Sequence, residues 1–197
     1  MNRQYIGFDP GKSGHGIKLE GSEVTKYKYP LIGDEYDIEG MIEIFKNFDR
    51  DRCHIVIEDV KALQKPFDSG NWSLSRGKTI LEVICTSLKL PYTLVHSKTW
   101  QKEIWQGVPI QKKPTNKKNK AGEVVYDTDT KSTTLLAIKR LFPGVDLREE
   151  VETKYYSDTP ENRKLNRANQ PIPRKGETPH DGLVDALALA EYCRRKF

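Results

Sequence analysis

The first thirty residues alternate between apolar and polar positions with a period of two, which is typical of β-strands. This pattern predicts strands over Arg3–Asp9, Gly14–Glu20 and Glu23–Tyr29. Gly21-Ser22, between the second and third strands, is a hairpin signal. We therefore expect the chain to begin with a three-stranded antiparallel meander.

From Asp37 onward the apolar spacing changes to three and four residues, which indicates helices separated by short strands. Two more strands are predicted over His54–Glu58 and Pro91–Val95; the first is a continuous apolar run, as expected of a buried strand. Helices are predicted over Asp37–Phe48, Ser73–Leu90, Lys98–Trp105, Asp129 or Thr130 to Phe142, and Asp181–Arg195. A meander followed by crossover units predicts an α/β fold, in which helices flank a mixed five-stranded sheet.

Two stretches have no core pattern. One is a lysine-rich segment at about 111–127, and the other is a long polar segment at about 148–179. Both are longer than ordinary connections, so we interpret them as functional loops or disordered segments. The length of 197 residues and the absence of an internal repeat favour a single domain over 1–197.

Composition indicates which kind of partner and which cellular compartment to expect. The net charge of +5 and the pI near 9.0 permit a polyanionic partner. Cys53, Cys85 and Cys193 lie in apolar segments, as expected of buried thiols in a reducing compartment. No apolar run has membrane-spanning length and no signal peptide is evident. We expect a location in the cytoplasm of a bacterial or phage-infected cell, or in an organellar matrix.

Four acidic residues stand where apolar elements meet polar loops. Asp9 ends the first strand, Glu58 ends the strand CHIVIE, and Asp181 and Asp185 begin the last helix. The last two are four residues apart, so they share a helix face, and their repulsion at the edge of a buried face is costly without a cation or hydrogen bonds. Hard oxygen ligands from three elements are what Mg²⁺ or Mn²⁺ requires, and two such ions can assist phosphodiester hydrolysis.

Each acid also has a simpler interpretation. Asp9 lies in Asp-Pro-Gly, which is a turn sequence, and a glycine-flanked Asp after a strand also suits a nucleotide-phosphate loop. Asp181 is a candidate N-cap of the last helix, beside His180. A Glu-Asp pair at the end of a strand, as at Glu58, is common. The set of four is therefore a stronger signal than any member.

At these residues the chain resembles the RuvC family of Holliday-junction resolvases, in the ribonuclease H-like superfamily, and looks most similar to its phage and chloroplast branches. The matching segments are IGFDPGKSGHG, IVIEDV, PYTLVHSKTWQKEIWQG, DTKSTTLLAIKRLFP and HDGLVDALALAEY. The resemblance implies a sheet in the order 3-2-1-4-5, a homodimer, and symmetric metal-assisted nicks across a four-way junction. It assigns Asp9, Glu58, Asp181 and Asp185 as ligands of two Mg²⁺ ions, for which Mn²⁺ would substitute.

One departure concerns the last helix. Familiar bacterial resolvases space the final two acidic ligands three apart, whereas here Gly182 lies three before Asp185 and Asp181 lies four before it. The phage and chloroplast branches look similar to the four-spaced form. Asp181 is nevertheless the less secure ligand, and His180 is its nearest competitor.

DNA contacts are predicted from basic and aromatic residues. The family places the loop after the catalytic Glu against the junction, and the candidates in and after that loop are Lys65, Phe67, Trp72, Arg76 and Lys78. Further candidates are Lys98, Lys131 and the lysine run that includes Lys112, Lys113, Lys117 and Lys118. Solvated charge equally explains the lysine run, and Trp72 could anchor the following helix. Trp100 and Trp105 are interpreted as core or dimer contacts.

Three functions are considered. The first is a crossover junction endodeoxyribonuclease that leaves 5′-phosphate and 3′-hydroxyl nicks, with Lys131 stabilising charge on the phosphate; a broader debranching nuclease shares this chemistry. The second is an ATP-binding protein of the sugar-kinase or actin type, which would be much longer and would need a second phosphate loop that the sequence lacks. The third is a junction-binding protein without catalysis.

Overall fold

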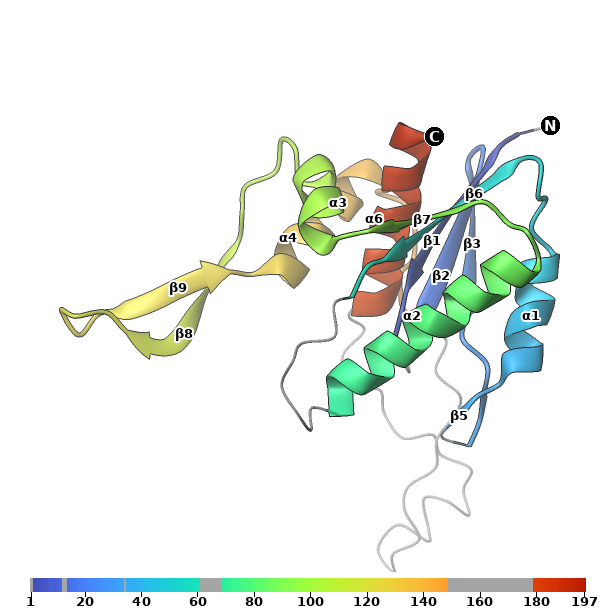
Figure 1. Ribbon diagram of the computed structural model, residues 1–197. Helices are drawn as coiled ribbons and strands as arrows, with labels where there is room; N and C mark the ends of the chain where they lie inside the picture. Colours follow the sequence, from blue (N-terminus) through green and yellow to red (C-terminus); the bar gives the residue numbers. More distant parts are fainter. Residues whose placement is uncertain (1, 12–13, 34, 61–68, 149–178) are drawn as a thin grey trace, which may run out of the picture.

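The computed structural model describes residues 2–11, 14–33, 35–60, 69–148 and 179–197, and within residues 69–73 it describes the backbone alone (Figure 1). The first half contains β1 (Gln4–Asp9), β2 (His15–Glu20), β3 (Glu23–Lys28), β4 (Leu31–Ile32), β5 (Glu35–Tyr36), α1 (Ile38–Lys46) and β6 (Cys53–Glu58). The second half contains α2 (Ser69–Ser87), β7 (Tyr92–Val95), α3 (Ser97–Ile104), β8 (Lys112–Lys118), β9 (Val124–Thr128), α4 (Thr130–Leu141) and α6 (Asp181–Lys196).

The main sheet has five strands in the order β3-β2-β1-β6-β7. β1 to β3 form the antiparallel meander, whereas β6 runs parallel to β1 and β7 runs parallel to β6. The predicted order 3-2-1-4-5 is confirmed, with β6 and β7 as its fourth and fifth strands. The sheet is mixed because hairpins join its first three strands and helical crossovers join the rest.

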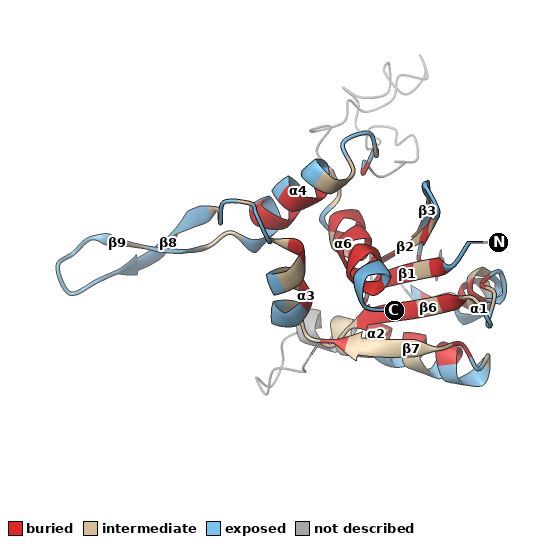
Figure 2. Ribbon diagram, turned by 90° about the horizontal axis from the view of Figure 1, so that it is seen from above, coloured by how far each residue is buried: buried red, intermediate tan, exposed pale blue. Residues whose placement is uncertain are grey.

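Alternating side chains of the central strands belong to two hydrophobic cores, one on each face of the sheet. Ile6 and Phe8 of β1 pack with α1 and α2, whereas Val56 of β6 packs with α3, α4 and α6. Phe8 stacks on Phe45 with ring centroids 4.8 Å apart. The protein therefore has three layers, with the sheet between two groups of helices (Figures 1 and 2).

α6 is the central helix of the second core, and it packs against β1, β2 and β6. Its residues from Gly182 to Cys193 are almost all buried, and alanines alternate through its middle. Gly7 of β1 allows a very close approach, because an added Cβ there would lie 2.3 Å from the backbone oxygen of Ala186 and 2.3 Å from the backbone nitrogen of Ala190. Small residues on both partners bring the helix directly onto the sheet.

The prediction that the lysine-rich segment is a functional loop or disordered was wrong about its structure. β8 and β9 pair as an antiparallel ribbon that projects from the body between α3 and α4 (Figures 1 and 2). The side chains of this ribbon are not buried in a core, so its sequence lacks the alternation of apolar and polar residues that identifies strands. Backbone hydrogen bonds hold the two strands together. β4 and β5, two residues each, are a second small pair that the sequence pattern did not indicate.

Predicted helix starts are confirmed where a cap is present. The Asp37 side chain accepts a hydrogen bond from the backbone N–H of Gly40, and the Asp129 side chain accepts one from the backbone N–H of Ser132. α2 begins at Ser69, four residues before its predicted start, because its first turn precedes the apolar pattern. Within the described segments, no helix combines the length and apolar character needed to cross a bilayer.

Candidate acidic active site

Asp9 and Glu58 come from the carboxyl ends of neighbouring parallel strands. Phe8 of β1 is in register with Ile57 of β6, so the next residue of each strand, Asp9 and Glu58, leaves the sheet at the same edge. In open α/β sheets this edge is where ligands bind. The parallel pairing thus places side by side two carboxylates that are 49 positions apart in the sequence.

The first turn of α6 covers this edge. Gly182 lies directly against Asp9, since an added Cβ would be 3.0 Å from Asp9 Oδ2 and 3.1 Å from His15 Nδ1. His180 is the N-cap of α6, and its Nδ1 accepts a hydrogen bond from the backbone N–H of Gly182 at 3.2 Å. The alternative in which Asp181 is the cap is therefore wrong. The cap belongs to the residue before it, which leaves the Asp181 carboxylate available for other contacts.

The electrostatic coupling among the acids shows that they lie near one another. Burial, together with the charges of Glu58 and Asp181, raises the pKa of Asp9 to about 7. Burial, together with the charges of Asp9, Glu58 and Asp181, raises the pKa of Asp185 well above its usual range. Burial also raises the pKa of Glu58, and the nearby indole N–H of Trp100 opposes that rise. These carboxylates carry a desolvation cost that a bound cation would offset.

Lys131 is the cation beside this group. From the first turn of α4 it forms an ion pair with Asp181, and both side chains are more than half exposed. The hydrogen bond to Asp181 raises the pKa of Lys131, and the charge of Asp185 adds to the rise. Lys131 also lowers the pKa of Asp9 and Asp185, though less than burial raises it. Two regions 50 positions apart in sequence thus meet at the acidic edge.

Among the residues that the structure describes, no group of three or more His, Cys, Asp or Glu side chains is arranged so that it could hold a metal ion, although the chemistry of the acids suits hard divalent ions. The acids supply oxygen donors from β1, β6 and α6, which is the ligand type that Mg²⁺ and Mn²⁺ prefer. The pKa values of Asp9 and Asp185 are raised first by burial and then by the charges of the neighbouring acids. Asp9, Glu58 and Asp185 are half-buried, and Asp181 is exposed.

The protein without metal is expected to lose stability as pH rises from about 4 to about 7. The Asp9 pKa is 3.8 in the reference state and about 7 in the fold. Between these values the folded state keeps a proton that the unfolded state has lost, so rising pH favours unfolding, by on the order of 4 kcal/mol across the window. Urea unfolding in EDTA, compared between wild type and Asp9→Asn, measures this contribution.

The free energy of unfolding of Asp9→Asn, relative to that of wild type, should increase from about pH 4 to about pH 7. Above pH 7 the difference between the two proteins should stay constant. Saturating Mg²⁺ should stabilise wild type more than the variant, because binding to the folded state alone adds to its stability. A difference between the two proteins that does not change with pH would contradict the raised pKa.

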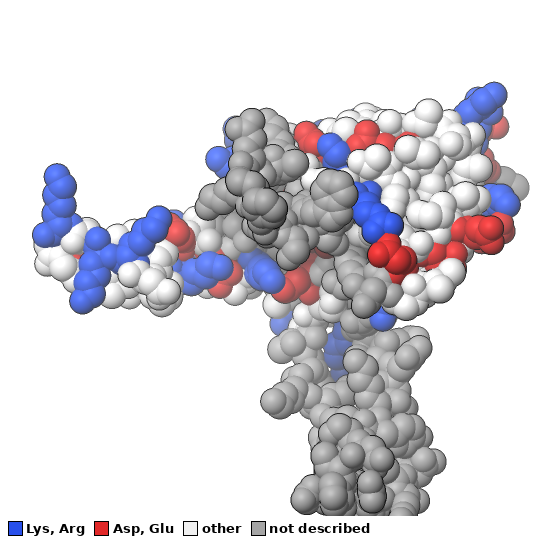
Figure 3. All heavy atoms as spheres, turned by 60° about the horizontal axis from the view of Figure 1, so that its bottom comes forward, with Lys and Arg blue, Asp and Glu red and all other residues white. Residues whose placement is uncertain are grey.

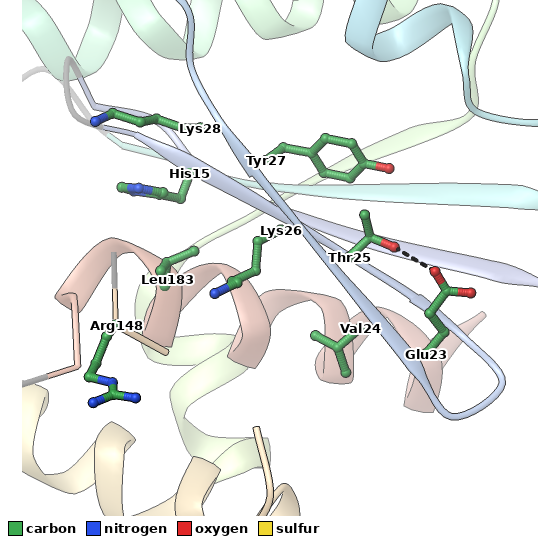
Figure 4. A pocket seen from close by; sticks show the side chains of 9 residues that line it. All are labelled: His15, Glu23, Val24, Thr25, Lys26, Tyr27, Lys28, Arg148 and Leu183. Atoms are coloured by element: carbon green, nitrogen blue, oxygen red, sulfur yellow. Dashed lines mark hydrogen bonds between the residues drawn. The ribbon is translucent and has the colours of Figure 1, made fainter. Parts of the chain in front are cut away.

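A hollow of about 410 Å³ lies beside the acidic edge, between β3, the start of α6 and the segment after α4. Its lining residues are His15, Glu23, Val24, Thr25, Lys26, Tyr27, Lys28, Arg148 and Leu183 (Figure 4). The Lys26 ammonium donates to the backbone oxygen of Asp146, and the Arg148 guanidinium pairs with the Asp146 carboxylate at 2.8 Å. Three cations against one lining carboxylate give the hollow a basic character.

Several predicted DNA contacts are engaged in ion pairs within the chain. Arg76 pairs with Glu35 and lies over the Tyr36 ring, and Lys78 pairs with Asp59 at 2.8 Å. These pairs stabilise the approach of α2 to its neighbours, so DNA would have to compete for both side chains. Lys98, in contrast, is exposed in the first turn of α3.

The remaining candidates divide between the ribbon and the loop after Glu58. Lys65 and Phe67 lie outside the described residues, and Trp72 lies in the first turn of α2, where the backbone alone is described. The four predicted lysines at 112, 113, 117 and 118 lie on β8, fully exposed. Trp100 is 1% exposed and belongs to the core, as predicted. Trp105 packs against that core and its indole N–H donates to Thr134.

Sequence reasoning did not identify three neighbours of the acids. His15 is buried against the start of α6, with its ring centroid 4.5 Å from that of His180. Gly182 provides the space for the Asp9 carboxylate, and Trp100 lies near Glu58. The only available signal was local: His15 and Gly182 stand inside the two motifs that carry Asp9 and Asp185.

Comparison with known proteins yields similarity at the level of the fold. No protein-family profile matches the sequence, and no curated protein matches it. Among solved structures, the chain is similar to T. thermophilus RuvC in complex with a Holliday junction substrate, with 11% sequence identity and a TM-score of 0.48. The similarity covers 96% of this chain and 94% of the other.

Proposed function

We propose that this protein is a divalent-metal-dependent endonuclease that resolves four-way DNA junctions by paired nicks. The observation that carries the proposal is the meeting of Asp9, Glu58 and Asp185 at one sheet edge, buried enough that the pKa of each is raised. Carboxylates grouped in this way are typical ligands of divalent cations, and metal-assisted hydrolysis is the chemistry that such a site performs on phosphodiesters. The sequence motifs around the same acids add the resemblance to junction resolvases.

The proposed chemistry follows from the positions of the side chains. Asp9, Glu58 and Asp185, with Asp181, would hold two Mg²⁺ ions, which supply Lewis-acid stabilisation when bound. Water attacks the phosphorus in line, the P–O bond to the 3′ oxygen breaks, and a 5′ phosphate and a 3′ hydroxyl remain. Lys131, already beside Asp181, would stabilise the negative charge that develops on the phosphate oxygens.

Basic groups around the acids suit a polyanionic substrate. Lys131 flanks the acidic edge on one side, and the hollow that holds Lys26, Lys28 and Arg148 flanks it on another. Exposed Lys98 of α3 is a further proposed phosphate contact. The described part of the chain contains one such site, so paired symmetric nicks would require two copies, and we propose a homodimer as the active form.

Two related functions use the same surfaces. A broader debranching nuclease would share the acids and differ only in which DNA shapes it accepts. A non-catalytic junction-binding protein would keep the basic surfaces without needing the buried carboxylates. The cost of burying three acids with raised pKa values favours catalysis over binding alone.

A nicking assay on synthetic DNA separates these functions. The purified protein would be incubated with four-way, three-way, flap and linear duplex DNA in Mg²⁺, in Mn²⁺ and in EDTA. We expect paired symmetric nicks in the four-way junction only, dependent on metal, and ligatable afterwards. Cutting of three-way and flap DNA would indicate the debranching nuclease, and binding without cutting in either metal would overturn the catalytic proposal.

A further inference from the structure

The β8–β9 ribbon has more lysines than acidic residues and contributes nothing to either core. Residues 111–128 contain five lysines and two acidic residues, against a net charge of +5 for the whole chain. None of residues 112–127 is buried. An isolated two-stranded ribbon is marginally stable in water, so folding alone gives no reason to retain it. Figure 3 shows lysine side chains spread along the projecting arm.

The two faces of the ribbon differ in charge. On one face Lys113 is directly opposite Asp127, so a lysine and an acid oppose each other. On the other face Pro114 is opposite Tyr126 and Lys118 is opposite Val124, while Lys112 is opposite Thr128. This second face, named here the Tyr126 face, has two lysines and no acid in those pairs. Tyr126 is 61% exposed and Val124 is 45% exposed.

The base of the ribbon is connected by hydrogen bonds to residues next to the acidic edge. The backbone N–H of Gln111 donates to the buried Thr133 hydroxyl at 3.0 Å, and the backbone N–H of Asp129 donates to the Gln111 oxygen at 2.9 Å. Asp129 is also the N-cap of α4, whose first turn carries Lys131, the partner of Asp181. The ribbon therefore leaves the body close to the proposed scissile phosphate.

We propose that the Tyr126 face binds the backbone and groove of a duplex DNA arm beside the cut site. The proposal rests on the proposed function for the nature of the substrate. A two-stranded β-ribbon fits the major groove of B-DNA. Because β8 has a register shift between Pro114 and Lys118, the length of the ladder is set by the five residues of β9, which span about 17 Å, against about 34 Å for one turn of the duplex. Lysines contact phosphates while the tyrosine and valine lie toward the groove.

The test measures binding in EDTA, so it does not depend on cutting. Four-way junctions with arms of about 10 and about 30 base pairs, one and three helical turns, are titrated at several salt concentrations. For long arms, K112A/K118A should reduce the slope of log affinity against log salt by about 2, because two phosphate contacts are lost. Tyr126→Ser should weaken binding with the slope unchanged, because no charge is removed. Both effects should be smaller for short arms.

One control matches the charge change. K46A/R50A removes two exposed cations in and just after α1 and should leave the slope for long arms unchanged. Equal effects of K112A/K118A and K46A/R50A on the slope would overturn the proposal, as would Tyr126→Ser binding long arms as tightly as wild type. So would an equal loss of single-stranded DNA binding. Failure of wild type to cut any DNA, with the slope changes as expected, would refute the nuclease and leave the ribbon as a duplex-binding element.

Discussion

Asp9→Asn and Asp185→Asn are each expected to reduce metal-dependent cutting of four-way junctions by about 10³-fold or more, with junction binding in EDTA unchanged. Asparagine keeps the size of the side chain but removes the charge that would hold a divalent ion. Both acids lie close enough to the other carboxylates to share their charge, so losing either one should weaken cation binding by the whole group. Single-turnover cleavage and gel-shift titration, performed on the same protein preparations, measure the two quantities.

The controls for this experiment use the same chemical change elsewhere. Asp51→Asn alters an exposed aspartate outside the proposed site and should leave cutting within about twofold of wild type. Asp181→Asn should have an intermediate effect, because that acid is exposed and already paired with Lys131. Substantial metal-dependent cutting by either Asp9→Asn or Asp185→Asn would refute the assignment of these residues.

The parts of the fold that were predicted correctly have local signals. Alternation and the Gly21-Ser22 turn indicate the meander, and the apolar run before Glu58 indicates a buried strand. That β6 lies beside β1 is a pairing between distant segments, and periodicity carries no information about it. The strand order was therefore reached through the resemblance, and the observed sheet confirms it.

The errors have equally physical causes. The β8–β9 ribbon is held by backbone pairing and buries no side chain, so its lysines gave the composition of a loop. The cap of α6 falls on His180 rather than on Asp181 because adjacent residues with acceptor side chains compete for the same backbone N–H groups. Roles that depend on three-dimensional contact, such as Gly182 against Asp9, leave no pattern in a single sequence.

Gly7→Ala is expected to destabilise the protein by about 4 kcal/mol or more, enough to prevent accumulation of the native fold. The added Cβ would lie 2.3 Å from the Ala186 oxygen and the Ala190 nitrogen, and 2.7 Å from the Leu189 Cβ. Two of these are helix backbone atoms, so no rotamer change relieves the overlap. α6 would have to lift from β1, β2 and β6 together. Urea unfolding followed by circular dichroism measures the loss.

Gly144→Ala is the matched control, because an added Cβ there meets nothing within 4 Å; its free energy of unfolding should stay within about 0.5 kcal/mol of wild type. Gly7 is two residues before Asp9, and the atoms it would strike lie one and five residues after Asp185. The contact that fixes the helix on the sheet is thus also the contact that brings the two buried acids together. If Gly7→Ala unfolded within 1 kcal/mol of wild type, the close packing of α6 on β1 would be wrong, and with it the geometry of the acidic site.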